Sequence, residues 1–369
     1  MKITLLSNHY YRSLRRAGFH FLADALHAAG HEVTFITTGL SWISYARRDY
    51  RCSYPGIREA HGRLCEERPG FFSYVHFTMW HPHTLILPLL DSMSSRFVYR
   101  YDRFSMGEAE NKIASSDIII YESCNALFLV EKCLKLAPKA KNIYRVSDDI
   151  RVLRSAHPEL QIVEKKVSET FNLISVPCSY LAKKFSESCN VRLHPHGVNT
   201  MLFDAVDNSP YAEGVNAVFV GNAYLDYEFI EKASGACPEI MFHLIGSFQK
   251  DLKRDNVVYH GEMAFEDTVP YVKFADIGLY CLDLSCSSHS RSFTDSLKLK
   301  QYRYCGLPVV APSGLDLCRE GVFYYDTFRS DSCKTALADA LQCGRDPTRA
   351  DEVSGWDAVA TDILSDLYR

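Results

Sequence analysis

The chain has 369 residues, 47% of them hydrophobic and 23% charged, which favours two α/β domains of ordinary size and excludes extensive disorder. Its thirteen cysteines include no CxxC pair, so neither a disulfide framework nor a zinc site is indicated. The apolar run before Ser7 is too short for a signal peptide, and Pro88 interrupts the most apolar stretch, so we expect a protein that stays in a reducing compartment and crosses no bilayer.

The net charge of −4 conceals an uneven distribution. Residues 1–197 carry 26 Lys and Arg against 19 Asp and Glu, whereas residues 198–369 carry 15 against 26. A basic half suits an anionic partner, which could be a nucleic acid, a phospholipid surface or a lipid diphosphate. Two domains with unlike solvated surfaces would give the same count, so both interpretations stay open.

The first elements form a βαβ unit. A strand is predicted over Lys2–Leu6, followed by a helical pattern that ends at Gly30, where a C-cap glycine belongs. The next apolar run, Val33–Ile36, is the second strand. Residues 42–71 and 72–101 show no clear periodicity and are rich in Arg, Tyr, Phe and His. They are either an acceptor-binding or membrane surface or an irregular part of the first domain.

Short apolar runs then alternate with helical patterns along the rest of the chain, which is typical of parallel sheets buried on both faces. The pattern restarts near residue 198, so the sequence predicts two Rossmann-like domains, 1–197 and 198–355, with a last helix at about 356–369 packing back on the first. The strands expected are Asp117–Tyr121, Asn142–Val146, Leu173–Val176, Ala217–Val220, Met241–Ile245, Val257–Tyr259, Ile277–Cys281 and Pro308–Val310.

Two adjacent aspartates follow the strand Asn142–Val146. At the carboxyl end of a strand, a carboxylate can take a proton from an attacking hydroxyl. Asp is also a preferred helix N-cap. We therefore expect one of Asp148 and Asp149 to be a catalytic base and the other to be a cap.

Two further segments suit a phosphate. The helix that begins near Ser296 presents free backbone N–H groups and carries Lys298 in its first turn, although a capped surface helix would look the same. Gly221 ends a predicted strand and would let a ligand approach the backbone closely.

Several motifs are absent from the sequence. It contains no Asp-x-Asp, no HExxH and no GxxxxGK[ST], so a metal-held nucleotide and a P-loop ATPase are not expected. We expect no cofactor and no metal. If nucleotide phosphate binds, backbone dipoles and Lys298 must neutralise it.

Several stretches resemble GT-B glycosyltransferases in order and spacing: LHAAGHEVTFIT, HPHGVNTMLFD, VFVGN and SLKLKQYRYCGLPVVAP. More closely, LSNHYYRSLRRAGFHFL, IIIYES, YRVSDD, PHGVN, SPYAEGVNAVFVG, YHGEM and DSLKLKQY through GLPVVAP resemble the membrane-associated glucuronosyltransferases of xanthan assembly. The resemblance implies two Rossmann-like domains facing a cleft. It also implies an inverting, metal-independent enzyme that moves glucuronate from UDP-glucuronate onto the mannose of a polyprenyl-diphosphate-linked oligosaccharide.

By position in these motifs, the catalytic base falls on Asp148, and Arg15, Arg16 and Glu122 are assigned to the acceptor or the membrane. The family's methionine after the glycine turn is Ala223 here, and an aromatic residue expected near Leu282 is missing, with Tyr280 close by. The donor-binding positions are Gly221, Asn222, Ala223, Glu262, Tyr280, Ser296, Leu297, Lys298 and Gln301.

The partners implied are a UDP-sugar, a lipid-linked oligosaccharide and an anionic membrane surface, with no nucleic acid. We expect a cytoplasmic protein held peripherally at the inner face of the plasma membrane by the aromatic stretch Phe71–Trp80 and by Arg12, Arg15, Arg16, Arg47 and Arg48. The alternatives are a GT-B transferase with another UDP-sugar donor or a soluble acceptor, and a nucleotide- or glycan-binding protein without turnover.

Overall fold

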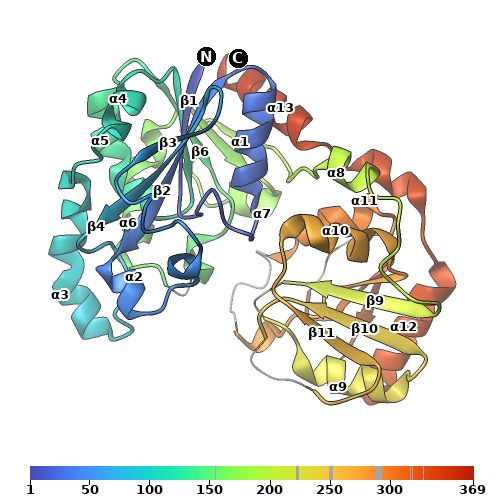
Figure 1. Ribbon diagram of the computed structural model, residues 1–369. Helices are drawn as coiled ribbons and strands as arrows, with labels where there is room; N and C mark the ends of the chain where they lie inside the picture. Colours follow the sequence, from blue (N-terminus) through green and yellow to red (C-terminus); the bar gives the residue numbers. More distant parts are fainter. Residues whose placement is uncertain are drawn as a thin grey trace. The chain divides into compact units, whose positions relative to one another are not determined.

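The computed structural model describes residues 1–153, 155–221, 224–248, 252–286, 293–315, 317, 319–326 and 328–369. The chain divides into two compact units, each built on its own sheet (Figure 1). Unit 1 comprises Met1–Ser13, Ala17–Pro195 and Asp357–Arg369, and unit 2 comprises Leu14–Arg16 and His196–Trp356.

Unit 1 contains an eight-stranded sheet, within the described residues, in the order β3-β4-β2-β1-β5-β6-β7-β8. All neighbouring strands are parallel except β3, which pairs antiparallel with β4. The strands are β1 (Lys2–Ser7), β2 (Glu32–Ser41), β3 (Leu64–Arg68), β4 (Phe71–Thr78), β5 (Ile118–Glu122), β6 (Lys141–Arg145), β7 (Leu173–Val176) and β8 (Val191–Leu193).

Helices cover this sheet because its central strands are buried on both faces; every residue of β5, for example, is buried. Helix α1 packs Phe19, Leu22 and Leu26 inward at helical spacing. The helices of the unit are α1 (Gly18–Ala28), α2 (Trp42–Ala46), α3 (Pro88–Val98), α4 (Ala109–Ala114), α5 (Val130–Leu136), α6 (Glu159–Val167), α7 (Ser179–Ala182) and α13 (Trp356–Leu367).

Residues 42–101, which show no clear periodicity, contain regular structure. Strand β4 lies in the sheet between β2 and β3, and Phe71, Ser73, Tyr74, Val75 and His76 on its two faces are all buried. Burial on both faces removes the alternation of polar and apolar residues that marks a half-exposed strand. The expectation that Phe71–Trp80 forms a membrane surface is therefore wrong for most of this stretch, because most of its residues are buried.

Helix α13 packs within unit 1. Asp366 lies 3.3 Å from Nε2 of His194, and the Tyr368 hydroxyl lies 3.7 Å from the sulfur of Met1. The two ends of the chain consequently lie side by side (Figure 1).

Unit 2 contains a six-stranded sheet of parallel strands, counted over the described residues, in the order β11-β10-β9-β12-β13-β14. The strands are β9 (Val215–Val220), β10 (Ile240–Ile245), β11 (Val257–Gly261), β12 (Ile277–Leu279), β13 (Val309–Pro312) and β14 (Val322–Tyr325). The helices are α8 (Thr200–Asp204), α9 (Tyr227–Ala236), α10 (Phe265–Phe274), α11 (Leu297–Tyr304) and α12 (Ser330–Cys343).

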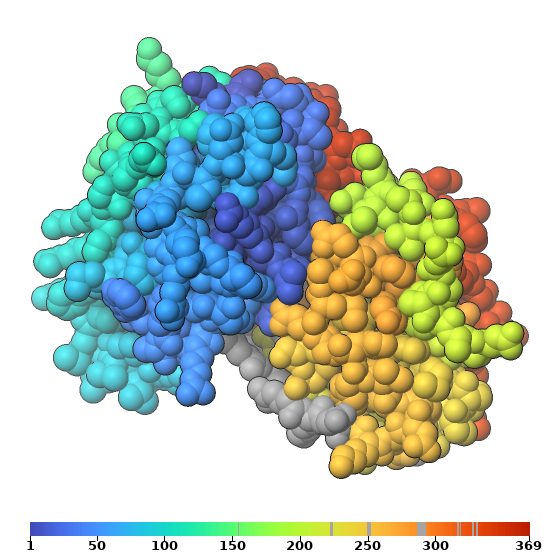
Figure 2. All heavy atoms as spheres, in the orientation of Figure 1, coloured from blue at the N-terminus to red at the C-terminus, as the bar shows by residue number. Residues whose placement is uncertain are grey.

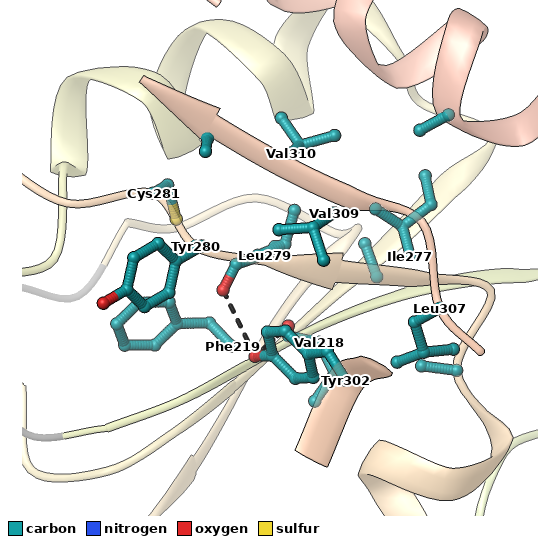
Figure 3. Close-up of a cluster of buried hydrophobic side chains, with 14 of the residues drawn as sticks. Val218, Phe219, Ile277, Leu279, Tyr280, Cys281, Tyr302, Leu307, Val309 and Val310 are labelled. Atoms are coloured by element: carbon teal, nitrogen blue, oxygen red, sulfur yellow. Dashed lines mark hydrogen bonds between the residues drawn. The ribbon is translucent and has the colours of Figure 1, made fainter. Parts of the chain in front are cut away.

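Tyr302 of α11 ties this helix to the core of unit 2. Its ring is fully buried, and its hydroxyl donates to the carbonyls of Val218 at 3.0 Å and Leu279 at 3.2 Å (Figure 3). Because the two carbonyls belong to the neighbouring strands β9 and β12, these bonds hold α11 against the sheet. No helix in the described part of the chain is both long and apolar enough to cross a membrane.

Candidate active site

Unit 1 has a cavity of about 290 Å³ at the carboxyl ends of its central strands. His9 follows β1, Gly39 lies near the end of β2, Glu122 ends β5 and Asp148 follows β6, and all four line the cavity. Ligands of open parallel sheets bind at this edge. The topology thus brings polar side chains from the ends of β1, β5 and β6 together beside the backbone of β2.

Asp148 opens to this cavity while its backbone is held in place. The hydroxyl of Ser123 accepts hydrogen bonds from the backbone N–H groups of Ser147 at 3.1 Å and Asp148 at 3.0 Å. The protein around the cavity partly desolvates the carboxylate, and Glu122 adds a negative charge beside it, so the pKa of Asp148 is raised to about 6. A carboxylate of that pKa is well matched to accept a proton near neutral pH.

Asp149 has the opposite environment. It is fully buried, forms ion pairs with Arg151 at 2.6 Å and Lys184 at 3.2 Å, and caps the short 3₁₀ turn Ile150–Val152. Burial alone would raise its pKa, but the hydrogen bond from Arg151 and the charge of Lys184 prevail and lower the pKa to about 2. The capping role therefore falls to Asp149, and the role of catalytic base stays a prediction for Asp148.

Glu122 forms a buried network with His9 and Ser7. The Ser7 hydroxyl donates a short hydrogen bond to the Glu122 carboxylate, and Nε2 of His9 lies 3.5 Å from the other carboxylate oxygen. Burial opposes the charge on both groups, but their mutual attraction prevails, so the pKa of His9 is raised and that of Glu122 is lowered. Glu122 lies inside the cavity, which suits contact with an acceptor and does not suit contact with a membrane.

Arg51, which the sequence analysis did not single out, shapes the same cavity. Its buried guanidinium pairs with Asp49 at 2.7 Å and donates to the backbone carbonyls of Asn8 at 2.6 Å and Gly39 at 2.8 Å. It thereby joins the loop after β1 to the end of β2. An isolated Arg in an aperiodic segment carries no local signal of such a role.

Unit 2 has its own cavity of about 240 Å³. Five of the predicted donor-binding residues line it, namely Gly221, Glu262, Leu297, Lys298 and Gln301. They lie at the carboxyl ends of β9 and β11 and at the start of α11. The fold therefore brings these predicted positions together, although their roles stay predictions.

Lys298 is one of three cationic residues that line this cavity, with Arg15 and Arg16. Its Nζ lies 3.6 Å from the centre of the Phe219 ring and 5.5 Å from that of Tyr280. Burial lowers the pKa of Lys298 to about 7, and among the described residues no carboxylate forms an ion pair with it. A Cβ atom on Gly221 would lie 3.0 Å from Nζ, so glycine leaves room for Lys298 at this point.

The remaining predicted donor residues have different positions. Ser296 is the N-cap of α11, accepting from the Leu299 N–H at 3.4 Å. Tyr280 is buried, does not line the cavity, and donates its hydroxyl to the Phe293 carbonyl at 2.6 Å. Asn222 and Ala223 lie outside the described residues.

Arg15 and Arg16 line the unit 2 cavity. Arg15 donates to both carboxylate oxygens of Glu262, at 2.6 and 2.7 Å. Their position in the family's motifs predicts a role at the acceptor or the membrane for these arginines, but they lie beside the predicted donor-binding residues. Among the described residues, no group of three or more His, Cys, Asp or Glu could hold a metal ion.

The fold resembles that of solved glycosyltransferases. The apo structure of OtsA aligns with a TM-score of 0.63 and 12% identity over 100% of this chain and 99% of that chain. Anabaena HepE, solved with UDP and glucose, aligns with a TM-score of 0.62 and 13% identity over 100% of this chain and 99% of that chain. AviGT4, from avilamycin A biosynthesis, aligns with a TM-score of 0.54 and 14% identity over 100% of this chain and 97% of that chain. The two parallel-sheet units therefore have the GT-B fold of these enzymes.

Sequence similarity narrows the class. UDP-glucuronate:glycolipid 2-beta-glucuronosyltransferase of Xanthomonas campestris pv. campestris is 30% identical over 366 residues, covering 98% of this chain and 88% of that protein. Residues 5–177 match the family model described as the N-terminal domain of the glucuronosyltransferase GumK. The protein is a GT-B glycosyltransferase, and it belongs to the GumK-like glucuronosyltransferase family.

Proposed function

We propose that the protein transfers glucuronate from UDP-glucuronate to a mannose hydroxyl of a polyprenyl-diphosphate-linked oligosaccharide, inverting the anomeric centre without a metal ion. The observation that carries this proposal is Asp148, a carboxylate with a pKa of about 6 at the carboxyl end of β6, in a polar cavity. The name of the Xanthomonas relative, which includes UDP-glucuronate and a glycolipid, supports the donor and the kind of acceptor.

Asp148 acts as the general base. It accepts the proton of the acceptor hydroxyl while that oxygen attacks the anomeric carbon from the face opposite UDP. The new carbon–oxygen bond forms as the bond to the diphosphate breaks, and UDP leaves with the bonding electrons. A single displacement of this kind inverts the configuration at the anomeric carbon.

Lys298 and the start of α11 stabilise the leaving diphosphate. The free N–H groups and dipole of the helix start favour negative charge, and Lys298 adds a full positive charge within the same cavity. Charge that develops on the leaving group is best stabilised by groups already in place. These residues take the role that a divalent ion fills in metal-dependent transferases.

A lipid-linked acceptor keeps the reaction at a membrane. The UDP-sugar donor belongs to the cytoplasm, so the protein works at the inner face of the plasma membrane during exopolysaccharide assembly. The anionic surface there attracts basic residues of unit 1. We propose no nucleic-acid partner.

A donor and acceptor assay tests this function. The protein is incubated with lipid-linked oligosaccharide and labelled UDP-glucuronate, UDP-glucose, UDP-galactose or UDP-N-acetylglucosamine, with and without EDTA. We expect glucuronate transfer that resists EDTA and gives a β linkage in the NMR spectrum of the product.

Each rival function gives its own result in this assay. Preference for another UDP-sugar would show that glucuronate is not the sugar transferred. Transfer to a free oligosaccharide as fast as to the lipid-linked form would show that the acceptor is soluble. UDP binding with no transfer to any acceptor would identify a binding protein. The Asp148→Asn variant is the inactive control for every reaction.

A further inference from the structure

Unit 1 carries an exposed apolar surface formed by helix α3 and the loop before it. Three of its side chains are largely exposed, Ile86 at 73%, Leu89 at 75% and Met93 at 66%. Leu85, Leu87, Leu90 and Phe97 extend the same surface. We call these seven residues the α3 face; they belong to the segment that runs along the lower left edge of Figure 2 in cyan.

Helix α3 has the reverse of the usual amphipathic arrangement. A surface helix normally buries its apolar stripe and exposes its polar one, but here Asp91 is buried, and the Ser94 hydroxyl is hydrogen-bonded to Nε2 of His157 at 3.0 Å. The inward face thus has polar contacts beside a single buried apolar residue, Val98. Contiguous apolar patches of this kind mark interaction sites.

The loop before α3 is built to present its apolar residues. Asp91 accepts hydrogen bonds from the Thr84 hydroxyl at 2.7 Å and the Leu85 N–H at 2.6 Å, and the Thr84 hydroxyl accepts from the Ile86 N–H at 3.0 Å. Ile86 has a φ of 72°, a conformation that β-branched residues rarely adopt. The polar contacts hold this residue outward despite the strain.

Positive charges border the α3 face. Arg96 lies on the helix and Arg100 just after it, and both are exposed. Arg47 donates to the carbonyl of Thr84 at 3.2 Å, which brings a third exposed cation beside the loop. An apolar face rimmed by Arg matches the interface of an anionic bilayer, where apolar side chains enter the acyl boundary and cations meet headgroups.

We infer that the α3 face inserts into the interfacial layer of an anionic lipid bilayer and is the element that docks unit 1 on the membrane. This inference rests on the proposed function, because a lipid-linked acceptor requires the enzyme at a bilayer. It narrows the expectation that residues 42–101 form an acceptor-binding or membrane surface, and it replaces the contact expected at Phe71–Trp80 with one at the α3 face.

The test uses the full chain and vesicles of phosphatidylcholine with or without phosphatidylglycerol. The triple variant Ile86→Ser, Leu89→Ser, Met93→Ser should lose co-sedimentation with anionic vesicles by about 10-fold or more, since three apolar side chains leave the acyl boundary. Met201→Ser is the matched control, because Met201 is 83% exposed in unit 2 and should bind as the wild type does. In Met93→Trp, brominated lipids should quench the new indole.

Membrane docking by the α3 face and catalysis by Asp148 can be tested independently. The triple variant should keep its UDP affinity, its melting temperature and its transfer to a detergent-dispersed acceptor, while Asp148→Asn should bind vesicles and not transfer. Wild-type vesicle binding by the triple variant would overturn the docking role. A different result would also overturn it: a wild-type protein that is a dimer in sedimentation velocity and does not bind vesicles, with a triple variant that is a monomer. The α3 face would then be covered by a second copy of the chain.

Discussion

Nε2 of His9 lies 3.5 Å from Oε1 of Glu122, although 112 residues separate them in the sequence. The two side chains come from the carboxyl ends of neighbouring strands β1 and β5, and both line the cavity that contains Asp148. Glu122 therefore remains ionised in a buried position. Its negative charge makes Asp148 a stronger base than an isolated aspartate.

Asp148→Asn should abolish most of the transfer activity, because the amide keeps the size of the carboxylate and cannot accept a proton. We expect turnover to fall by about 10²–10⁴-fold, with unchanged UDP affinity. Asp149→Asn should lower the melting temperature and leave more activity, because this residue caps and pairs rather than reacts. Measuring the transfer rate, UDP affinity and melting temperature of both variants tests these expectations. An active Asp148→Asn enzyme would show that Asp148 is not the general base.

The pH profile should report the Asp148 carboxylate. A base with a pKa of about 6 is active above that pH and loses activity as the pH falls through it. In Glu122→Gln the neighbouring negative charge is gone, so the pKa of Asp148 should fall and the acidic limb of the kcat profile should move to lower pH. An unmoved limb in this variant would mean that Glu122 does not influence the base.

Lys298→Ala should weaken UDP binding and slow transfer. A charge-assisted contact to the diphosphate is lost both in the UDP complex and in the transition state of transfer. The expected loss of UDP affinity is about 10-fold or more, which corresponds to roughly 1.5–3 kcal/mol. Isothermal calorimetry measures it, with Lys300→Ala as the control, since Lys300 pairs with Asp295 and does not line the cavity. Equal affinities for UDP in the wild type and Lys298→Ala would move the phosphate site to the loop at Gly221.

UDP binding should be coupled to proton uptake by Lys298. Without ligand its pKa is lowered to about 7 by burial, so above that pH much of it is neutral. A bound diphosphate favours the charged form and raises the pKa, so UDP affinity should be steady below about pH 7 and fall above it. Calorimetry at pH 8 in two buffers of different ionisation enthalpy gives the protons taken up, and Lys298→Ala should take up fewer.

Gly39→Ala should destabilise unit 1 and disturb its cavity. Gly39 has a φ of 64°, and a Cβ atom there would lie 2.7 Å from Nδ2 of Asn125 and 2.8 Å from Oδ1 of Asn8. Gly30→Ala is the matched control, with a φ of 85° and no atom within 4 Å. We expect Gly39→Ala to cost about 1–3 kcal/mol more than the control, measured by denaturant unfolding. Equal costs would show that the two amides move aside freely.

Much of the fold could be predicted from local patterns. Buried strands such as β1, β5 and β9 appear as short apolar runs, and their alternation with helices is typical of a parallel sheet. Strand β4 escaped prediction because Ser73 and His76 are buried with its aromatic residues, which leaves no periodicity to detect. Helix α3 escaped prediction as well, because its exposed apolar residues and its buried Asp91 do not form the usual pattern of a surface helix.

The sequence by itself determined that Asp148 follows a buried strand and that Lys298 begins a helix, because both depend only on neighbouring residues. Only the tertiary structure decided that Asp149 is paired while no described residue forms an ion pair with Asp148, that Glu122 meets His9, and that Arg15 meets Glu262. The charge state of a carboxylate and the exposure of an apolar side chain depend on what lies within a few ångströms. The pairs His9–Glu122 and Arg15–Glu262 join residues more than a hundred positions apart, where no local periodicity reaches.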